Sequence, residues 1–141
     1  MLKVGDQAPD IPGLAELRGK RVVLYFYPKA DTPGCTIEAC EFRDQARKFT
    51  AKGAAVVGIS PDKPAALDKF KAKYDLPFVL LSDAEKEAAQ AFGVWKEKTM
   101  YGKKVMGIVR TTFIIGEDGK IAKIFPKVKA QGHAEQVLAV L

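Results

Sequence analysis

Continuous apolar runs that alternate with helical segments constrain the fold of this chain more than any other feature. The run RVVLYFY at 21–27 and the run AAVVGIS at 54–60 have the pattern of strands that are buried on both faces of a sheet. A third strand is predicted at 78–83. Strands that alternate with helices pair in parallel through helical crossovers. The helices predicted in this half of the chain cover residues 35–52, 64–75 and 84–92.

The second half of the chain predicts a different arrangement. Strands at 108–115 and 120–126 flank the segment GEDG at 116–119, which is a strong hairpin turn. A last helix is predicted over 132–141. Parallel strands followed by an antiparallel hairpin predict an α/β protein with a thioredoxin-like fold, in which helices flank a central mixed sheet. We expect one domain over residues 1–141, large enough to fold without a disulfide or a metal.

Composition argues against several classes of function. The net charge of +6 could attract polyanions, but the lysines are interleaved with acidic residues, so we expect a solvated surface and no nucleic-acid partner. No apolar run approaches the roughly 18 residues that span a bilayer, and the start MLKVGDQAPDIPG is unlike a secretion signal. We therefore expect a cytoplasmic protein whose two cysteines are kept reduced. The single histidine, His133, argues against a metal site.

Cys35 lies at the start of the first long predicted helix. Thr32 is a suitable N-cap and Pro33 suits the first helical position, which puts Cys35 at the third. A capping box would have a carboxylate at that position. Free backbone N–H groups and the positive end of the helix dipole would therefore stabilise a negative charge there. Because the thiolate is the attacking form of cysteine, we predict that Cys35 is a nucleophile.

The charged partner of Cys35 is predicted to be an arginine. A nucleophilic cysteine usually has a histidine base, but His133 lies in the last helix and nothing in the sequence brings it to Cys35. Arg110 interrupts the apolar strand GIVRTTFII, where a charge is costly unless it is paired, and its guanidinium could donate to a thiolate and a peroxide. Glu38, one helical turn after Cys35, could orient Arg110. The alternatives are that Arg110 and Glu38 each point to solvent.

Cys40 follows Cys35 by five residues. In an α-helix this spacing separates the two Cα atoms by roughly 8.6 Å, whereas a disulfide needs about 7 Å or less. We therefore expect peroxide to oxidise Cys35 to a sulfenic acid, the first helical turns to unwind, and Cys40 to close a disulfide. In the alternative, Cys40 is only a small buried residue. Its predicted place near Arg43 and Arg47, away from the apolar stripe of the helix, favours the resolving role.

The segment VVLYFYPKADTPGCTIEACEFRD at 22–44 resembles the peroxiredoxin signature Pro-x-x-x-Thr-x-x-Cys, which falls here on Pro28, Thr32 and Cys35. The CxxxxC spacing resembles the Q-type branch, also called the bacterioferritin comigratory protein group. The segments VVGISPDKP, LLSD, FGVWKEKTMYGKKVMGIVRTTFII and DGKI are similar to that branch as well. The stretch DIPGLAELRGK is shorter than its counterpart in such proteins, so we expect no full N-terminal hairpin.

This resemblance implies a thioredoxin-like fold and the reduction of hydrogen peroxide and organic hydroperoxides. It implies that Cys35 is the peroxidatic cysteine and Cys40 the resolving cysteine. It also implies that Thr32 hydrogen-bonds the peroxide, that Pro28 shields the thiolate from water and that Arg110 stabilises both. Thioredoxin or a similar dithiol protein would be the reductant. No metal or organic cofactor is implied, and proteins of this branch are often monomers.

Two aromatic residues are further candidates for the pocket, and two other functions stay open. Tyr27, next to Pro28, could line the pocket or belong to the strand core, and Trp95 could cover the pocket, although packing is the stronger expectation. A thiol–disulfide oxidoreductase without peroxidase activity would exchange disulfides with proteins. A non-enzymatic basic module would bind polyanions and would not need Cys35.

Overall fold

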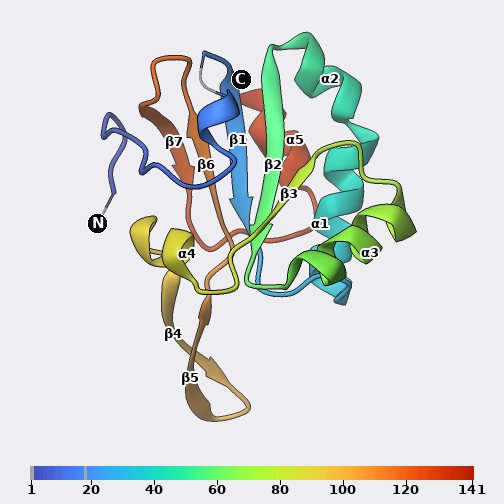
Figure 1. Ribbon diagram of the computed structural model, residues 1–141, viewed down its shortest axis with the longest axis vertical. Helices are drawn as coiled ribbons and strands as arrows, with labels where there is room; N and C mark the ends of the chain where they lie inside the picture. Colours follow the sequence, from blue (N-terminus) through green and yellow to red (C-terminus); the bar gives the residue numbers. More distant parts are fainter. Residues whose placement is uncertain (1, 18) are drawn as a thin grey trace.

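Residues 2–17 and 19–141 are described by the structure, a computed structural model of the chain (Figure 1). The strands are β1 (Arg21–Phe26), β2 (Ala54–Ser60), β3 (Val79–Ser82), β4 (Trp95–Met100), β5 (Lys103–Ile108), β6 (Thr111–Ile115) and β7 (Ile121–Phe125). The helices are α1 (Pro33–Asp44), α2 (Ala46–Ala51), α3 (Pro64–Tyr74), α4 (Glu87–Ala91) and α5 (His133–Ala139), with a 3₁₀ turn η1 (Ala15–Leu17). No helix in the described part of the chain is long and apolar enough to cross a membrane.

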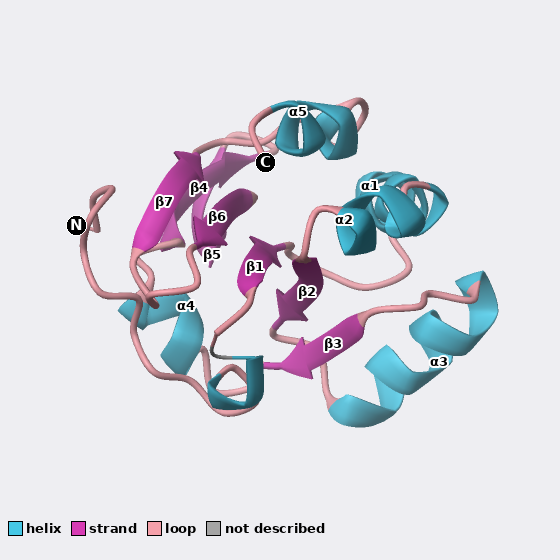
Figure 2. Cartoon of the chain, turned by 90° about the horizontal axis from the view of Figure 1, so that it is seen from above, coloured by secondary structure: helices cyan, strands magenta, loops and turns pink. Residues whose placement is uncertain are grey.

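Five strands form the central sheet in the order β3-β2-β1-β6-β7. The first three run parallel to one another, whereas β6 is antiparallel to both β1 and β7. Figure 2 shows α1, α2, α3 and α5 on one side of this sheet and α4 on the other. The predicted thioredoxin-like fold, a mixed sheet between layers of helices, is therefore confirmed.

Strand β1 lies at the centre of the sheet and is buried on both faces, as its continuous apolar run predicted. Val23, Tyr25 and the following Tyr27 face a core that includes Cys35 and Phe42 of α1. The alternate residues of β1, including Leu24 and Phe26, face a second core with α4 and the base of β5. The helix that begins at Pro33 thus packs directly on the middle strand of the sheet.

Gly58 of β2 allows this close packing. A Cβ atom at Gly58 would lie 2.9 Å from the ring of Tyr25 and from the side chain of Leu80, closer than real Cβ contacts. With only hydrogen at that position, the Tyr25 ring lies over β2 and stacks on Phe42 of α1, with ring centroids 4.7 Å apart. The packing of α1 against the sheet therefore depends on a strand residue that has no side chain.

Two predicted elements differ from the structure. The helix expected over 35–52 begins at Pro33 and divides at Gln45, whose backbone (φ −103°, ψ 7°) leaves the helical conformation. The break turns α2 so that Phe49 can pack on Phe42, with ring centroids 5.5 Å apart. The strand expected over 108–115 is shorter, because β6 begins only at Thr111 and Ile108 is the last residue of the preceding strand β5.

The β4–β5 ribbon, which projects from the body of the molecule, had no counterpart among the predicted elements (Figure 1). Its strands are largely exposed and rich in lysine, so they lack the apolar alternation that marks a half-buried strand. The turn is Tyr101-Gly102, and both residues have positive φ (52° and 77°), as in the tight turns that match strand twist. The N-terminal segment lies along β7 through backbone hydrogen bonds and an isolated bridge between Gln7 and Lys120.

Candidate active site

Helix α1 begins at Pro33, and Cys35 occupies its third position as predicted. Thr32 is the N-cap residue by its extended backbone, but its hydroxyl donates to the carbonyl of Lys29 at 2.7 Å. Thr32 is thus the N-cap residue, as predicted, although its side chain makes no capping hydrogen bond. No described side chain caps α1, so its first N–H groups stay free to face a negative charge.

Cys35 is 1% exposed, and its sulfur lies beside Arg110. The Arg110 guanidinium donates from Nη2 to Cys35 Sγ at 3.3 Å. The Arg110 side chain is only 17% exposed, so the alternative in which it points to solvent is wrong. A guanidinium and the start of a helix therefore meet at one sulfur, the surroundings in which reactive cysteines are found.

Glu38 completes the polar contacts of Arg110. Its Oε1 accepts a hydrogen bond from Arg110 Nη1 at 2.6 Å, so one guanidinium joins the carboxylate to the sulfur of Cys35. Glu38 is buried, which contradicts the solvent-exposed alternative. Burial raises the pKa of Glu38 to about 7, against the opposing effect of Arg110. Burial also works against the charge of Arg110, but Glu38 and Cys35 raise the pKa of Arg110 above its usual value.

The backbone around Arg110 is fixed by three neighbours. Arg110 follows the end of β5, and its carbonyl accepts a hydrogen bond from the Val128 N–H at 2.8 Å. The Lys98 ammonium donates to the Ile108 carbonyl at 2.6 Å, and the Val109 N–H donates to the carbonyl of Val94. Burial lowers the pKa of Lys98, and the nearby charge of Arg110 lowers it further. Lys98 was not among the predicted site residues, since nothing in its spacing separates it from the other lysines of the ribbon.

The other candidate residues fall in different places. Pro28 lies two residues after the end of β1 and is half-buried, and Tyr27, which precedes it, belongs to the same buried core as Cys35. Trp95 does not join them, because it packs against the core on the opposite face of the sheet, with the Lys86 ammonium 5.7 Å from its ring. Of the two aromatic candidates, the structure therefore brings only Tyr27 to the Cys35 side.

His133 is buried, and its ring nitrogens contact residues other than Cys35. Its Nε2 is 2.7 Å from Thr112 Oγ1, and its Nδ1 is 3.3 Å from Gln136 Oε1. Burial lowers the pKa of His133. The described residues contain no group of three or more His, Cys, Asp or Glu side chains that could hold a metal ion.

Cys40 lies on a different side of α1. It is half-buried, and both Cys35 and Cys40 are free thiols in an unbroken helix. Cys40 lies three residues before Arg43 on α1, so the two side chains share one side of the helix, as predicted. The site thus holds one sulfur against a guanidinium and a second sulfur nearer the surface, an arrangement suited to peroxide reduction followed by disulfide formation.

Comparisons with known proteins agree with this chemistry. The AhpC/TSA family matches residues 3–124 of the chain. Peroxiredoxin Bcp of Bacillus subtilis (strain 168) is 44% identical over 149 residues, which cover 99% of this chain and 95% of that protein. A cysteine-to-serine mutant of Xylella fastidiosa PrxQ superposes with a TM-score of 0.92 at 37% identity, covering 99% of this chain and 95% of that one.

A second solved structure adds a link to activity. The Xanthomonas campestris bacterioferritin comigratory protein, trapped in intermediate and ligand complexes of its alkyl peroxide reduction, superposes with a TM-score of 0.85. It is 42% identical, and the match covers 90% of this chain and 81% of that chain. The chain therefore belongs to the AhpC/TSA family and is a thiol-dependent peroxidase of the peroxiredoxin Bcp and PrxQ type.

Proposed function

We propose that the protein reduces hydrogen peroxide and organic hydroperoxides through a sulfenic acid on Cys35 and a disulfide between Cys35 and Cys40. The observation that carries this proposal is the hydrogen bond of 3.3 Å between Arg110 and the buried Cys35 sulfur at the third position of α1. The alkyl peroxide reduction of the Xanthomonas campestris relative supports the choice of substrate.

In the first step, the Cys35 thiolate attacks the terminal oxygen of the hydroperoxide. The sulfur–oxygen bond forms, the O–O bond breaks, and the leaving alkoxide or hydroxide takes a proton from solvent. Arg110 stabilises the thiolate and the negative charge that develops on the leaving oxygen. Glu38 orients the guanidinium, Thr32 hydrogen-bonds the peroxide, and Pro28 keeps water from the sulfur. Tyr27 forms the apolar wall behind the sulfur.

In the second step, Cys40 attacks the Cys35 sulfenic acid. The new S–S bond forms, the S–O bond breaks, and the hydroxide leaves as water with the proton of the Cys40 thiol. The helical spacing of the two cysteines requires the first turns of α1 to unwind, since their Cα atoms are roughly 8.6 Å apart in a helix. The half-exposed position of Cys40 supports this step, because its sulfur need not leave a packed core.

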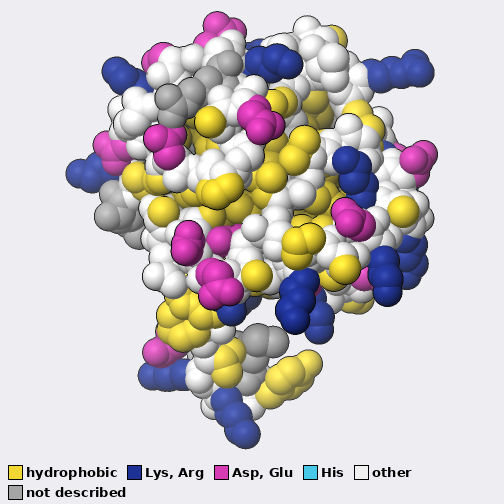
Figure 3. Space-filling model, viewed as in Figure 1, with side chains coloured by type: hydrophobic (Ala, Val, Ile, Leu, Met, Phe, Trp, Pro, Cys, Tyr) yellow, Lys and Arg dark blue, Asp and Glu magenta, His cyan; other side chains and the backbone are white. Residues whose placement is uncertain are grey.

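The disulfide is then reduced by thioredoxin or a similar dithiol protein, which is itself oxidised to a disulfide. Such a reductant is maintained in the cytoplasm, which we propose as the location. The protein works as a single-domain monomer without a metal, an organic cofactor or a nucleic-acid partner. Figure 3 shows lysine and arginine side chains spread among acidic residues on one face, which argues against a polyanion site on that face.

A coupled assay tests this function. Hydrogen peroxide or tert-butyl hydroperoxide is added to the protein with thioredoxin, thioredoxin reductase and NADPH. We expect NADPH oxidation that depends on every component, and peptide mapping should find a disulfide between Cys35 and Cys40. A protein that reduces insulin disulfides but leaves peroxide unconsumed would instead be the thiol–disulfide oxidoreductase, and undiminished peroxide consumption by Cys35→Ser would refute the proposal.

A further inference from the structure

The loop before α1 is held by the C-terminal end of α3. Lys73 Nζ lies 2.9 Å and 3.2 Å from the two carboxylate oxygens of Asp31, and the Tyr74 hydroxyl donates to Asp31 Oδ1 at 2.9 Å. Asp31 adopts a left-handed backbone (φ 58°), which is unfavourable for most residues and is tolerated by aspartate. The pKa of Asp31 is lowered by its hydrogen bonds to Lys73 and Tyr74, so the carboxylate is charged at neutral pH.

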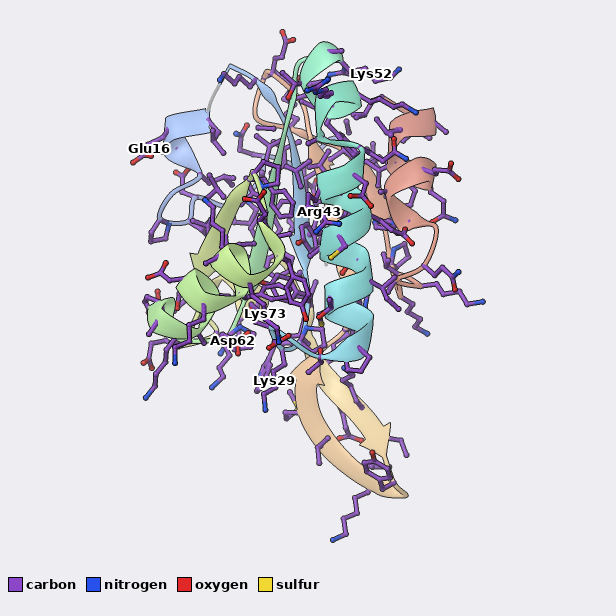
Figure 4. The ribbon with its side chains drawn as sticks, turned by 90° about the vertical axis from the view of Figure 1, so that its right-hand side faces the viewer. Glu16, Lys29, Arg43, Lys52, Asp62 and Lys73 are labelled. Atoms are coloured by element: carbon purple, nitrogen blue, oxygen red, sulfur yellow. The ribbon has the colours of Figure 1, made fainter. Side chains whose placement is uncertain are left out.

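The same end of α3 also holds the far end of α1. The Tyr74 carbonyl accepts a hydrogen bond from Arg43 Nη1 at 2.8 Å. Tyr74 therefore binds residue 31 through its hydroxyl and residue 43 through its carbonyl, and both cysteines lie between these two points. Figure 4 shows Arg43 on α1 and Lys73 on α3, with the two helices side by side. We call Asp31, Arg43, Lys73 and Tyr74 the α3 brace.

The α3 brace fits a helical segment between its two ends. The residues from Pro33 to Arg43 rise about 16 Å as an α-helix, at about 1.5 Å per residue. The same residues span a different and variable distance once the helix unwinds, since extended chain rises about 3.3 Å per residue. Either the brace contacts break on unwinding, or they persist and confine the unwound segment to a fixed span. Both outcomes favour the intact helix. In the first, the unwound state lacks the hydrogen bonds of the brace, and in the second, the confined unwound segment has less chain entropy.

We propose that Lys73 and Tyr74 are positioning residues for the resolving step, because they hold both ends of the segment that carries Cys35 and Cys40 and so set how readily it unwinds. This inference rests on the proposed function of the two cysteines. It assigns the rate of the second step to two residues that contact neither sulfur in the described structure. The α3 brace, rather than the active-site pocket, then controls how long the sulfenic acid persists.

The lifetime of the sulfenic acid decides between two products. Resolution by Cys40 forms the S–S bond and releases water. A second hydroperoxide can instead transfer its terminal oxygen to the Cys35 sulfenic acid, which is oxidised to sulfinic acid while the hydroperoxide is reduced to alcohol or water. The α3 brace slows the first route and leaves the second unaffected. A weaker brace should therefore protect the enzyme from inactivation by excess peroxide.

Tyr74→Phe tests the inference, because it removes the hydroxyl and keeps the ring. Tyr101→Phe is the matched control, since Tyr101 is 99% exposed at the tip of the β4–β5 ribbon. Lys73→Met removes the ammonium, and Lys103→Met on the exposed ribbon is its control. Rapid mixing with hydrogen peroxide would separate sulfenic acid formation from disulfide formation, and mass spectrometry after excess peroxide would give the fraction of sulfinic acid.

We expect Tyr74→Phe and Lys73→Met each to speed disulfide formation by about two- to tenfold, the effect of one lost hydrogen bond. The sulfinic fraction should fall in step, and the rate of peroxide attack should change far less. The thiol–disulfide equilibrium of both variants with dithiothreitol should also shift toward the disulfide. A variant that had only lost activity for an indirect reason would not show this shift. Lys73→Arg, which keeps a positive charge, should form the disulfide at the wild-type rate.

Two results would overturn the inference, and they are distinguishable. Disulfide rates and sulfinic fractions equal to those of Tyr101→Phe and Lys103→Met would refute the role of the α3 brace while leaving the proposed function intact. Oxidised wild-type protein without a disulfide between Cys35 and Cys40 would refute the proposed function and the inference together.

Discussion

The two cysteines lie on one helix but in different surroundings. Cys35 is 1% exposed, packs in the core of the sheet and accepts a hydrogen bond from Arg110 at 3.3 Å. Cys40 is half-buried and shares one side of α1 with Arg43, three residues further on, outside that core. The buried side of α1 thus places one sulfur against a guanidinium, whereas the outer side carries the second sulfur outside the packed core.

Exchange of each cysteine for serine would test this division most strongly. Cys35→Ser should abolish peroxide reduction, because a hydroxyl of ordinary acidity does not supply the attacking anion. Cys40→Ser should still consume about one peroxide per chain in a rapid burst, since the attack step needs only the Cys35 side of the helix. Stopped-flow measurement of peroxide loss, with a sulfenic acid trap, separates the two variants. A missing burst in Cys40→Ser would show that both sulfurs belong to one site.

Removal of the guanidinium should produce the next largest effect. Arg110→Met should slow sulfenic acid formation by about 100- to 1000-fold, the usual cost of losing a donor that stabilises charge in a transition state. Arg110→Lys should recover only part of the rate, because one ammonium cannot replace the fork that joins Glu38 and Cys35. Arg47→Met, at an exposed position of α2, is the control. Equal rates of sulfenic acid formation in Arg110→Met and Arg47→Met would contradict the difference between the two sides of α1.

The buried carboxylate should give a smaller effect that depends on pH. The pKa of Glu38 is raised by burial from its usual 4.5 to about 7, so the folded protein holds this proton more tightly than the unfolded chain does. This contribution to stability is present below about pH 4.5 and is lost as pH rises through about 7, on the order of 3 kcal/mol in total.

Glu38→Gln should remove this loss of stability at rising pH. Urea unfolding at about pH 5 and about pH 8 should therefore show a smaller fall in the free energy of unfolding for Glu38→Gln than for the wild type. Glu87→Gln, an exposed helical glutamate, should keep the wild-type fall. The same fall in Glu38→Gln as in Glu87→Gln would mean that this carboxylate does not titrate differently in the folded protein.

The sequence predicted the sheet and the Cys35 side of the site better than the periphery. Long apolar runs specify buried strands, and β2 occupies the predicted residues 54–60. A charge within an apolar stretch requires a partner, which is why Arg110 could be connected with Cys35 and Glu38 before the fold was known. Thr32 is the N-cap residue that the sequence predicted, but an N-cap pattern does not reveal that its hydroxyl donates to the Lys29 carbonyl.

The peripheral elements were missed for a different reason. The β4–β5 ribbon is exposed, so its strands follow cross-strand pairing rather than an apolar period. The α3 brace joins residues that are 31 to 43 positions apart in the chain. Such contacts between distant segments leave no local pattern in the sequence, and only the arrangement of α1 against α3 brings them together.

Gly58 has a consequence that reaches the reacting sulfur. Adding a single methyl group there would push against the Tyr25 ring, which stacks on Phe42, and Phe42 is anchored in the same helix as Cys35. A change at Gly58 would therefore alter the distance between the Cys35 thiol and the Arg110 guanidinium through the stacked rings of Tyr25 and Phe42. An alanine at this position would misalign the chemistry without touching any group that performs it.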